Sequence, residues 1–335
     1  MVGMGNLLKL FKSDKSGFIK SSAYGNIYNP IYNKWSKFIP GIPEIYNKNG
    51  ERMDIFFIRD SHFAHNPYYL TNSPTKFLFD RFNIGLDTHF YSHNAMLETM
   101  GNPRHKYGLL IESRAIVPKD YKIFDKNPGL YKDFDAIFTY DADILNKVPN
   151  AKFFPSCAEP WYGTNGRGII DANAYLQKSK NVSIVSSDKT YCDLHKFRLN
   201  LARRCRDENL CDTFGTFDGG KPVNIADTLA QYMYSIVIEN DISPYFFTER
   251  ITNCFMSMTI PIYYGATDIG KFFNTDGIIF IKPGDDIADI LKNCTVQDYK
   301  SRTKAILDNF HRVQKYTNIW DFLYNEYMIT DGNKK

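Results

Sequence analysis

The sequence contains no uninterrupted apolar run of the length that crosses a bilayer, which is about 18 residues. We therefore expect no membrane-spanning segment. Its six cysteines form no C-x-x-C pair and no compact framework, which argues against a zinc ribbon or a disulfide scaffold and favours reduced thiols in a cytoplasmic protein. The sequence also has no HExxH motif and no internal repeat, so it gives no sign of that class of zinc enzyme or of a solenoid.

The excess of positive over negative charge is also small, since 41 Lys and Arg residues oppose 37 Asp and Glu residues and leave a net charge of +4. An excess this small does not indicate a nucleic-acid-binding surface. Aromatic residues, in contrast, make up 16% of the chain, with 23 Tyr and 26 Phe. Tyrosine suits walls that are apolar at one end and wet at the other. Such walls are typical of sites for sugars and nucleobases.

The first 20 residues place Leu7, Leu8 and Phe11 at helical spacing, with lysines between and after them. Two interpretations stay open. The segment is a solvated helix, as short amphipathic stretches are in many soluble proteins. Alternatively, it is a weak interfacial helix that brings the protein to the inner face of a membrane as a peripheral partner.

Short apolar runs alternate with segments that form a helical face, which indicates an α/β chain with parallel strands. The expected strands of the first half are 53–58, 107–111, 136–139 and 152–154, with helical segments at 73–82 and 92–100. The expected strands of the second half are 181–185, 234–238, 259–264 and 277–281, with helices at 195–204, 225–232, 248–256 and 287–293 and a long one from 295 to about 316. Pro160 and three glycines cluster within 159–167 and at 168, where we place a domain boundary. Two Rossmann-like domains that face a cleft, 1–160 and 161–335, are the simplest assembly.

The stretch from 238 to 265 carries the most chemistry. A buried strand delivers Glu239 and Asn240 to its carboxyl end, where open α/β sheets bind ligands. Thr248 can cap the following helix, which places Glu249 and Arg250 in its first turn. A cation in a first turn opposes the helix dipole, so we expect Arg250 to meet an anion such as a diphosphate. The carboxylates of Glu239 and Glu249 are candidate acceptors for ribose or sugar hydroxyls.

These residues form a spaced pattern of three parts: E-N at 239–240, F-F-T-E-R at 246–250 and T-I-P-I-Y-Y-G at 259–265. The pattern resembles the donor-binding motif of the α1,3/4-fucosyltransferase family, whose fold is GT-B. Two positions differ, because Arg250 stands where the family has lysine and Phe246 where it has tyrosine, with Tyr245 adjacent.

The resemblance extends upstream. V-S-S at 185–187 is similar to a strand end that the family follows with a helix bearing a basic donor-phosphate contact; by spacing we favour Lys196, with Arg198 as its neighbour. I-E-S at 111–113 resembles the E-S-P segment of the family, whose glutamate is taken as the general base, although Arg114 replaces the proline. Residues 134–143 resemble a further family stretch.

The resemblance implies an inverting glycosyltransferase that moves L-fucose from GDP-fucose to a glycan hydroxyl in an α1,3-type linkage. It implies that 1–160 binds the acceptor and 161–335 the donor, with the C-terminal helix packing back on the first domain. It implies Glu112 as the base and no obligatory metal or other cofactor. The implied donor-binding residues are Lys196, Arg198, Glu239, Asn240, Tyr245, Phe246, Thr248, Glu249 and Arg250.

Other interpretations remain open. The chain is a GT-B enzyme for another sugar nucleotide, or a sugar-nucleotide-binding protein with a degenerate site. Asp141 and Asp143 form a D-x-D that holds a metal in a different glycosyltransferase fold, and the pairs His62–His65 and His89–His93 are conceivable metal ligands. For the histidines we favour solvent-exposed or capping roles over ligation. The acceptor stays unidentified.

Overall fold

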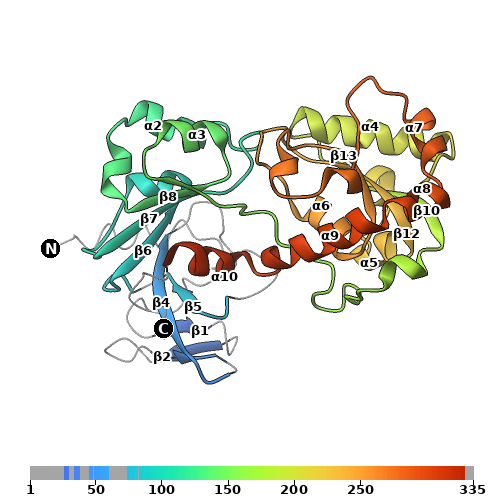
Figure 1. The fold of residues 1–335 in the computed structure, drawn as a ribbon. Coiled ribbons are helices and arrows are strands. Elements are labelled where there is room, and N and C mark those ends of the chain that lie inside the picture. The colour runs from blue at the N-terminus through green and yellow to red at the C-terminus, as the bar shows by residue number, and fades with distance from the viewer. Residues whose placement is uncertain are drawn as a thin grey trace.

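The computed structural model describes residues 26–29, 34–37, 45–47, 49–59, 74–81 and 83–328. Two lobes, each built on a parallel sheet, lie side by side, and the chain passes from the first to the second near its middle (Figure 1). An antiparallel pair, β1 (Asn26–Asn29) with β2 (Lys34–Lys37), precedes the first sheet.

The first sheet contains a run of six parallel strands and an antiparallel edge strand, β3, in the order β3-β4-β6-β7-β8-β9, with β5 also paired to β4. Its strands are β3 (Ile45–Tyr46), β4 (Arg52–Arg59), β5 (Phe77–Asp80), β6 (Thr88–Ser92), β7 (His105–Leu110), β8 (Ala136–Thr139) and β9 (Ala151–Phe153). Its short helices are η2 (His93–Leu97), η3 (Asp120–Lys122), α2 (Ile123–Lys126), η4 (Leu130–Asp133) and α3 (Ala142–Lys147).

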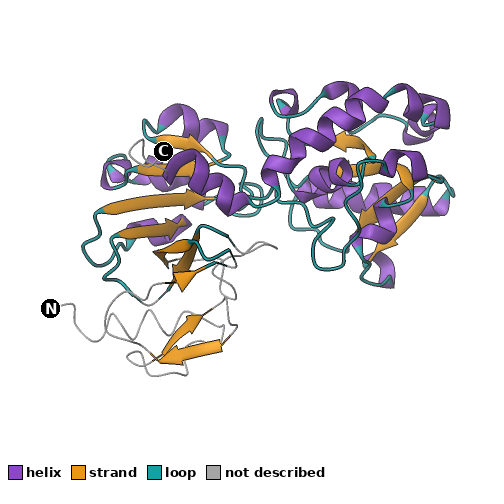
Figure 2. Cartoon of the chain, turned by 60° about the horizontal axis from the view of Figure 1, so that its bottom comes forward, coloured by secondary structure: helices purple, strands orange, loops and turns teal. Residues whose placement is uncertain are grey.

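The second sheet is parallel throughout, in the order β11-β10-β12-β13-β14, and helices pack around it (Figure 2). Its strands are β10 (Lys180–Ser186), β11 (Asp212–Gly215), β12 (Tyr232–Ile238), β13 (Ile260–Tyr264) and β14 (Ile279–Phe280). The helices of this half are η5 (Ala174–Gln177), α4 (Asp193–Asp207), η6 (Phe217–Gly219), α5 (Ile225–Leu229), α6 (Glu249–Met256), η7 (Ile269–Lys271), η8 (Thr275–Gly277), α7 (Ile287–Asn293), α8 (Val296–Ser301), α9 (Thr303–Val313) and η9 (Gln314–Tyr316).

The strand order reverses once in each sheet. In the second sheet β10 and β12 are neighbours whose chains continue in opposite directions, to β11 on one side and β13 on the other. Open parallel sheets bind ligands outside the carboxyl ends of the strands at such a reversal. Every residue of β12 is buried, because both faces of this central strand are covered. The predicted α/β class, with two Rossmann-like domains, is confirmed.

The end of the chain returns to the first sheet. Helix α10 (Ile319–Leu323) continues into η10 (Tyr324–Met328) and lies beside β4 and β5 (Figure 1). Trp320 is 1% exposed and packs on Phe79 and Phe154, with ring centroids 5.1 and 5.6 Å away. Asp321 accepts hydrogen bonds from the backbone and side chain of Thr75, both at 2.7 Å. The hydrophobic core of the first sheet therefore includes the last helix.

Two predictions of local structure were wrong. Segment 73–82 contains strand β5, whose four residues are all buried, because it pairs with β4 and Trp320 packs on Phe77 and Phe79. The long helix predicted from 295 to about 316 is interrupted at Arg302, where α8 ends and α9 begins. Within the described ranges, none of the helices combines the length and the apolarity needed to cross a membrane.

Candidate active site at the facing edges of the two sheets

A fully buried carboxylate joins the end of β12 to the start of α6. Glu239 Oε1 accepts the Thr248 N–H at 3.0 Å, and Oε2 accepts the Thr248 hydroxyl at 2.7 Å. The Thr248 oxygen in turn caps α6 by accepting the Arg250 N–H at 3.2 Å. The predicted cap is confirmed. In this structure the Glu239 carboxylate has no free surface for the predicted contact with a sugar hydroxyl, because it is 0% exposed and accepts two hydrogen bonds from Thr248.

Gly265 gives Glu239 the room to lie there. A Cβ at this position, directly after β13, would stand 2.5 Å from Glu239 Cγ and would also strike the Tyr263 hydroxyl. A side chain at 265 would therefore displace the carboxylate. This contact explains why the 259–265 motif ends in glycine.

Arg250 lies between carboxylates and keeps part of its surface in solvent. Its NH1 group is 3.5 Å from Glu239 Oε2 and 3.8 Å from Glu249 Oε1, and its side chain is 28% exposed. Burial works against its charge, but Glu249 and Glu239 outweigh that effect and raise the pKa of Arg250. The guanidinium is held in place and remains open on one side.

Helix α4 places a second guanidinium, that of Arg198, at the same edge of the second sheet. Arg198 is 6% exposed and donates from NH1 to the Ile238 carbonyl at 2.7 Å and to Asn240 Oδ1 at 3.3 Å. Lys196, which we favoured from spacing, points the other way: it is 58% exposed and pairs with Asp193 at 3.2 Å. The structure thus brings Arg198, and not Lys196, to Asn240 and Arg250, because residues two apart on a helix lie on nearly opposite faces.

His195 belongs to the same cluster, although the sequence analysis assigned it no role. It is 3% exposed, and its Nδ1 has no hydrogen-bond partner among the described residues. Burial, together with the positive charges of Arg198 and Arg250, lowers the pKa of His195 to about 4, against the opposing effect of a hydrogen bond with Asn240. The imidazole is therefore neutral at pH 7.

Two aromatic residues of the predicted donor site lie instead where the two lobes touch. Phe246 is 2% exposed, and its ring is 4.7 Å from that of Tyr140 in the first lobe. The Tyr245 hydroxyl accepts a hydrogen bond from Lys271 Nζ at 2.9 Å, and its ring packs against Phe153 at 6.1 Å. Both rings contribute to the contact between the two lobes.

On the first sheet, Glu112 follows the carboxyl end of β7 and is partly exposed. Its Oε1 accepts the N–H of the next residue, Ser113, at 2.7 Å. Arg114 does not neutralise it, since that guanidinium binds both oxygens of Asp141 at 2.7 Å and stacks on the Tyr121 ring at 4.9 Å. The Glu112 carboxylate therefore faces the site without a salt bridge to its neighbour.

The D-x-D pair, Asp141 and Asp143, is hydrogen-bonded to Arg114. Asp141 is 2% exposed, and it also caps α3 by accepting the Ile144 N–H at 3.0 Å. Asp143 lies 3.4 Å from Arg114 and bonds Lys147. Among the described residues, no group of three or more His, Cys, Asp or Glu side chains is arranged to hold a metal ion. His89 and His93 are fully buried, so the expectation of exposed histidines was wrong for this pair.

Cys157 shows that the two edges meet. Burial raises the pKa of its thiol, and the negative charges of Glu112, Glu249 and Glu239 raise it further. Arg250 in turn interacts electrostatically with Cys157. One small side chain on the connection between the lobes is thus close to Glu112 of the first sheet and to Glu249 and Arg250 of the second.

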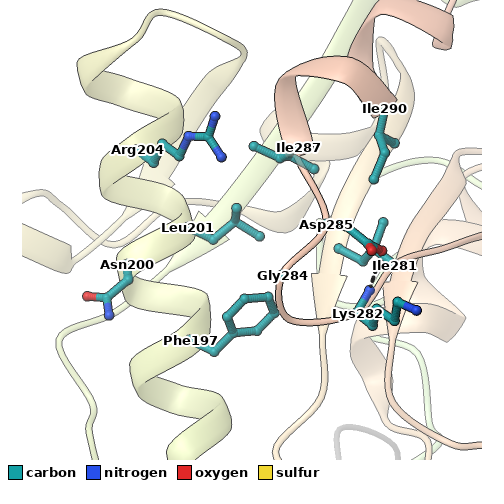
Figure 3. A pocket seen from close by; sticks show the side chains of 10 residues that line it. All are labelled: Phe197, Asn200, Leu201, Arg204, Ile281, Lys282, Gly284, Asp285, Ile287 and Ile290. Atoms are coloured by element: carbon teal, nitrogen blue, oxygen red, sulfur yellow. Dashed lines mark hydrogen bonds between the residues drawn. The ribbon is translucent and has the colours of Figure 1, made fainter.

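A separate cavity of about 340 Å³ lies between α4 and the loop from β14 to α7 (Figure 3). Its walls are mostly apolar, with Phe197 on one side and Gly284 opposite (Figure 3). Arg204 at its rim is already bound to Glu208 and Asp286, at 2.9 and 2.8 Å. We place the candidate site at Arg198 and Arg250 instead, because they lie at the carboxyl end of β12, where open parallel sheets bind ligands.

The interfacial-helix prediction for the first 20 residues and the His62–His65 pair fall outside the described residues.

No family model and no curated protein sequence matches the chain. Its structural neighbours are glycosyltransferases. An α1,3-fucosyltransferase with GDP is 15% identical over 84% of this chain and 96% of that chain, with a TM-score of 0.46. Another α1,3-fucosyltransferase structure is 14% identical over 81% and 84%, with a TM-score of 0.45. A T4 phage BGT mutant in complex with UDP-glucose is 13% identical over 82% and 99%, with a TM-score of 0.42. These identities are too low to transfer a substrate, so the role of each residue depends on this chain's own contacts.

Helix phase is the signal that could have found the α4 residues. Positions 195, 198, 199, 202 and 205 are buried at the spacing of one helical face. Leu199, Ala202 and Cys205 mark that face in the sequence, and His195 and Arg198 share it. No sequence signal marked Cys157.

We predict that His195 makes stability depend on pH. The folded state releases its proton near pH 4 and the unfolded chain near 6.5, so between these values the unfolded chain binds more protons. The free energy of unfolding should therefore fall as pH drops from 6.5 to 4, and His195→Gln should remove part of that fall. Urea unfolding of both proteins at pH 7 and 4.5 measures this. The same pH dependence in both would contradict the assignment.

Proposed function

We propose that this chain is an inverting glycosyltransferase that moves L-fucose from GDP-fucose to a glycan hydroxyl in an α1,3-type linkage. One observation carries the proposal: Glu112 at the end of β7 and Arg250 at the start of α6 both interact electrostatically with the Cys157 thiol, and Arg198 interacts with Arg250. The motifs at 239–240, 246–250 and 259–265 favour fucose as the sugar. In this proposal 1–160 binds the acceptor and 161–335 binds the donor.

The convergent charges suit displacement at an anomeric carbon. Glu112 takes the proton from the acceptor hydroxyl while its oxygen forms the new bond to the anomeric carbon. The bond from that carbon to the diphosphate breaks on the opposite face, which inverts the configuration. One further negative charge then develops on the β-phosphate of the leaving GDP, and Arg198 and Arg250 bind the diphosphate through charge-assisted hydrogen bonds. In this scheme the guanidiniums supply the positive charge, so no divalent metal is required.

Glu239 has an indirect part in this mechanism. Its carboxylate holds Thr248, and through Thr248 and a 3.5 Å contact it orients Arg250. Glu249 and Asn240 keep partly exposed side chains beside the two guanidiniums, and they remain our candidates for direct contact with the donor.

The donor is tested by calorimetry of the purified protein with GDP-fucose, GDP-mannose, UDP-glucose and UDP-N-acetylglucosamine. We expect GDP-fucose to bind most tightly, and transfer to a glycan array to give a fucosylated product. Preference for a uridine donor would move the assignment to another GT-B transferase. Binding of GDP-fucose with no transfer to any acceptor would point to a degenerate site.

We predict that Glu112→Gln lowers kcat by about 10²–10⁴-fold, since that is the usual contribution of a general base. The affinity for GDP should change by less than about twofold, because the base acts on the acceptor rather than on the diphosphate. Steady-state kinetics and GDP calorimetry separate the two effects. An equal loss of GDP affinity would argue against the role of the base.

We predict that Arg198→Gln weakens GDP binding by roughly 10- to 100-fold, the value of one or two hydrogen bonds to a charged group. Lys196→Gln is the matched control on the same helix and should change binding by less than about twofold, because its exposed pair with Asp193 contributes little. Circular dichroism checks that both variants fold. A larger effect at Lys196 than at Arg198 would reverse the assignment.

A further inference from the structure

His93 leaves the first sheet in a conformation that costs energy. Strand β6 ends at Ser92, and His93 follows with a φ of +51°, in the left-handed region that residues other than glycine rarely adopt. Such a residue costs roughly 1–3 kcal/mol and persists where the surroundings impose it. Its side chain is 0% exposed. The turn directs the imidazole inward, under the end of the neighbouring strand.

The imidazole replaces a strand partner for the residues that lead to Glu112. The pairing of β6 with β7 ends at Ser92 and Leu109. Beyond it, the N–H groups of Ile111 and Glu112 donate to His93 Nε2 at 3.3 and 3.2 Å. Two buried amides that β6 no longer pairs are thus satisfied by one side chain.

These contacts fix the tautomer of His93. A nitrogen that accepts two N–H groups carries a lone pair, so the ring proton lies on Nδ1. Nδ1 is 3.2 Å from Asp120 Oδ2, on a side chain 8% exposed. The other oxygen of Asp120 accepts the Asn94 amide at 2.8 Å. Asp120 therefore stabilises the tautomer that binds the strand end.

A tyrosine holds the other side of the same residue. The Tyr121 hydroxyl donates to the Glu112 carbonyl at 2.5 Å, and its ring meets the His93 ring edge-on at 6.3 Å. The Glu112 backbone is thus held at both its N–H and its C=O. The side-chain carboxylate is therefore the part of Glu112 that is left to take a proton from the acceptor.

We propose that His93 is a positioning residue for Glu112: its neutral imidazole, oriented by Asp120, sets where the carboxylate stands. This inference rests on the proposed function, since it assigns His93 to the same transfer reaction. His93 touches neither donor nor acceptor in this scheme, so it acts on kcat through Glu112 alone.

The main test is His93→Asn. Asparagine tolerates the left-handed backbone, but its side chain is too short to reach the Ile111 and Glu112 amides as imidazole does. We expect kcat to fall about 10- to 100-fold, with the donor KM and the GDP affinity within about twofold of the parent. Asp120→Asn is the second variant, for use if His93→Asn does not fold. It alters the partner of Nδ1 and should also lower kcat.

The matched controls are His105→Asn and Asp135→Asn. His105 and Asp135 form a similar pair, 3.1 Å apart, near the opposite end of β7, but both side chains are about half exposed. They should change kcat by less than about twofold. A similar loss in these controls would show a general effect of disturbing the sheet and overturn the proposal.

The double variant His93→Asn/Glu112→Gln separates positioning from structure. If His93 acts through Glu112, the double variant should be no more than about threefold slower than Glu112→Gln alone. Losses that multiply, in a parent that does transfer a sugar, would overturn the role of His93 and leave the proposed function standing. A parent that transfers from no sugar nucleotide would overturn the proposed function, and this inference with it.

Discussion

A carboxylate with no exposed surface, that of Glu239, is the constraint on which the second sheet's edge depends. Removing such a charge from water costs several kcal/mol, so it needs close partners. Thr248 supplies two hydrogen bonds and Arg250 a nearby positive charge. Gly265 leaves the space. Because all of these partners surround one buried group, any movement of Arg250 away from or toward Glu239 would cost free energy.

The ends of the central strands are held by different devices in the two sheets. Strand β7 runs past β6, so the amides of Ile111 and Glu112 have no partner on that strand. At the end of β12 the Glu239 side chain reaches forward to the N–H of Thr248, and at the end of β7 the His93 side chain accepts the N–H of Glu112. Both devices are fully buried. In the proposed reaction, Glu112 and Arg250 are each therefore presented beside a buried, hydrogen-bonded strand end.

Much of the fold follows from the sequence, because buried parallel strands are continuous apolar runs between helical segments. The site follows less well. The residue types at 239–250 indicated a helix cap, but not that Glu239 is enclosed, because enclosure depends on Gly265 arriving from the next strand. The choice between Lys196 and Arg198 required the phase of α4. Nothing local marks His93, since its role comes from the place where β6 stops beside β7.

The position of Trp320 has a consequence for how the protein is made. This ring fills the face of the first sheet against Phe79 and Phe154, yet it lies near the end of the chain. During synthesis the first lobe leaves the ribosome with that face uncovered. The face stays uncovered until the second lobe and then Trp320 have been synthesised. Partly built chains therefore expose aromatic surface, and the first lobe reaches its native packing only after the second lobe has been synthesised.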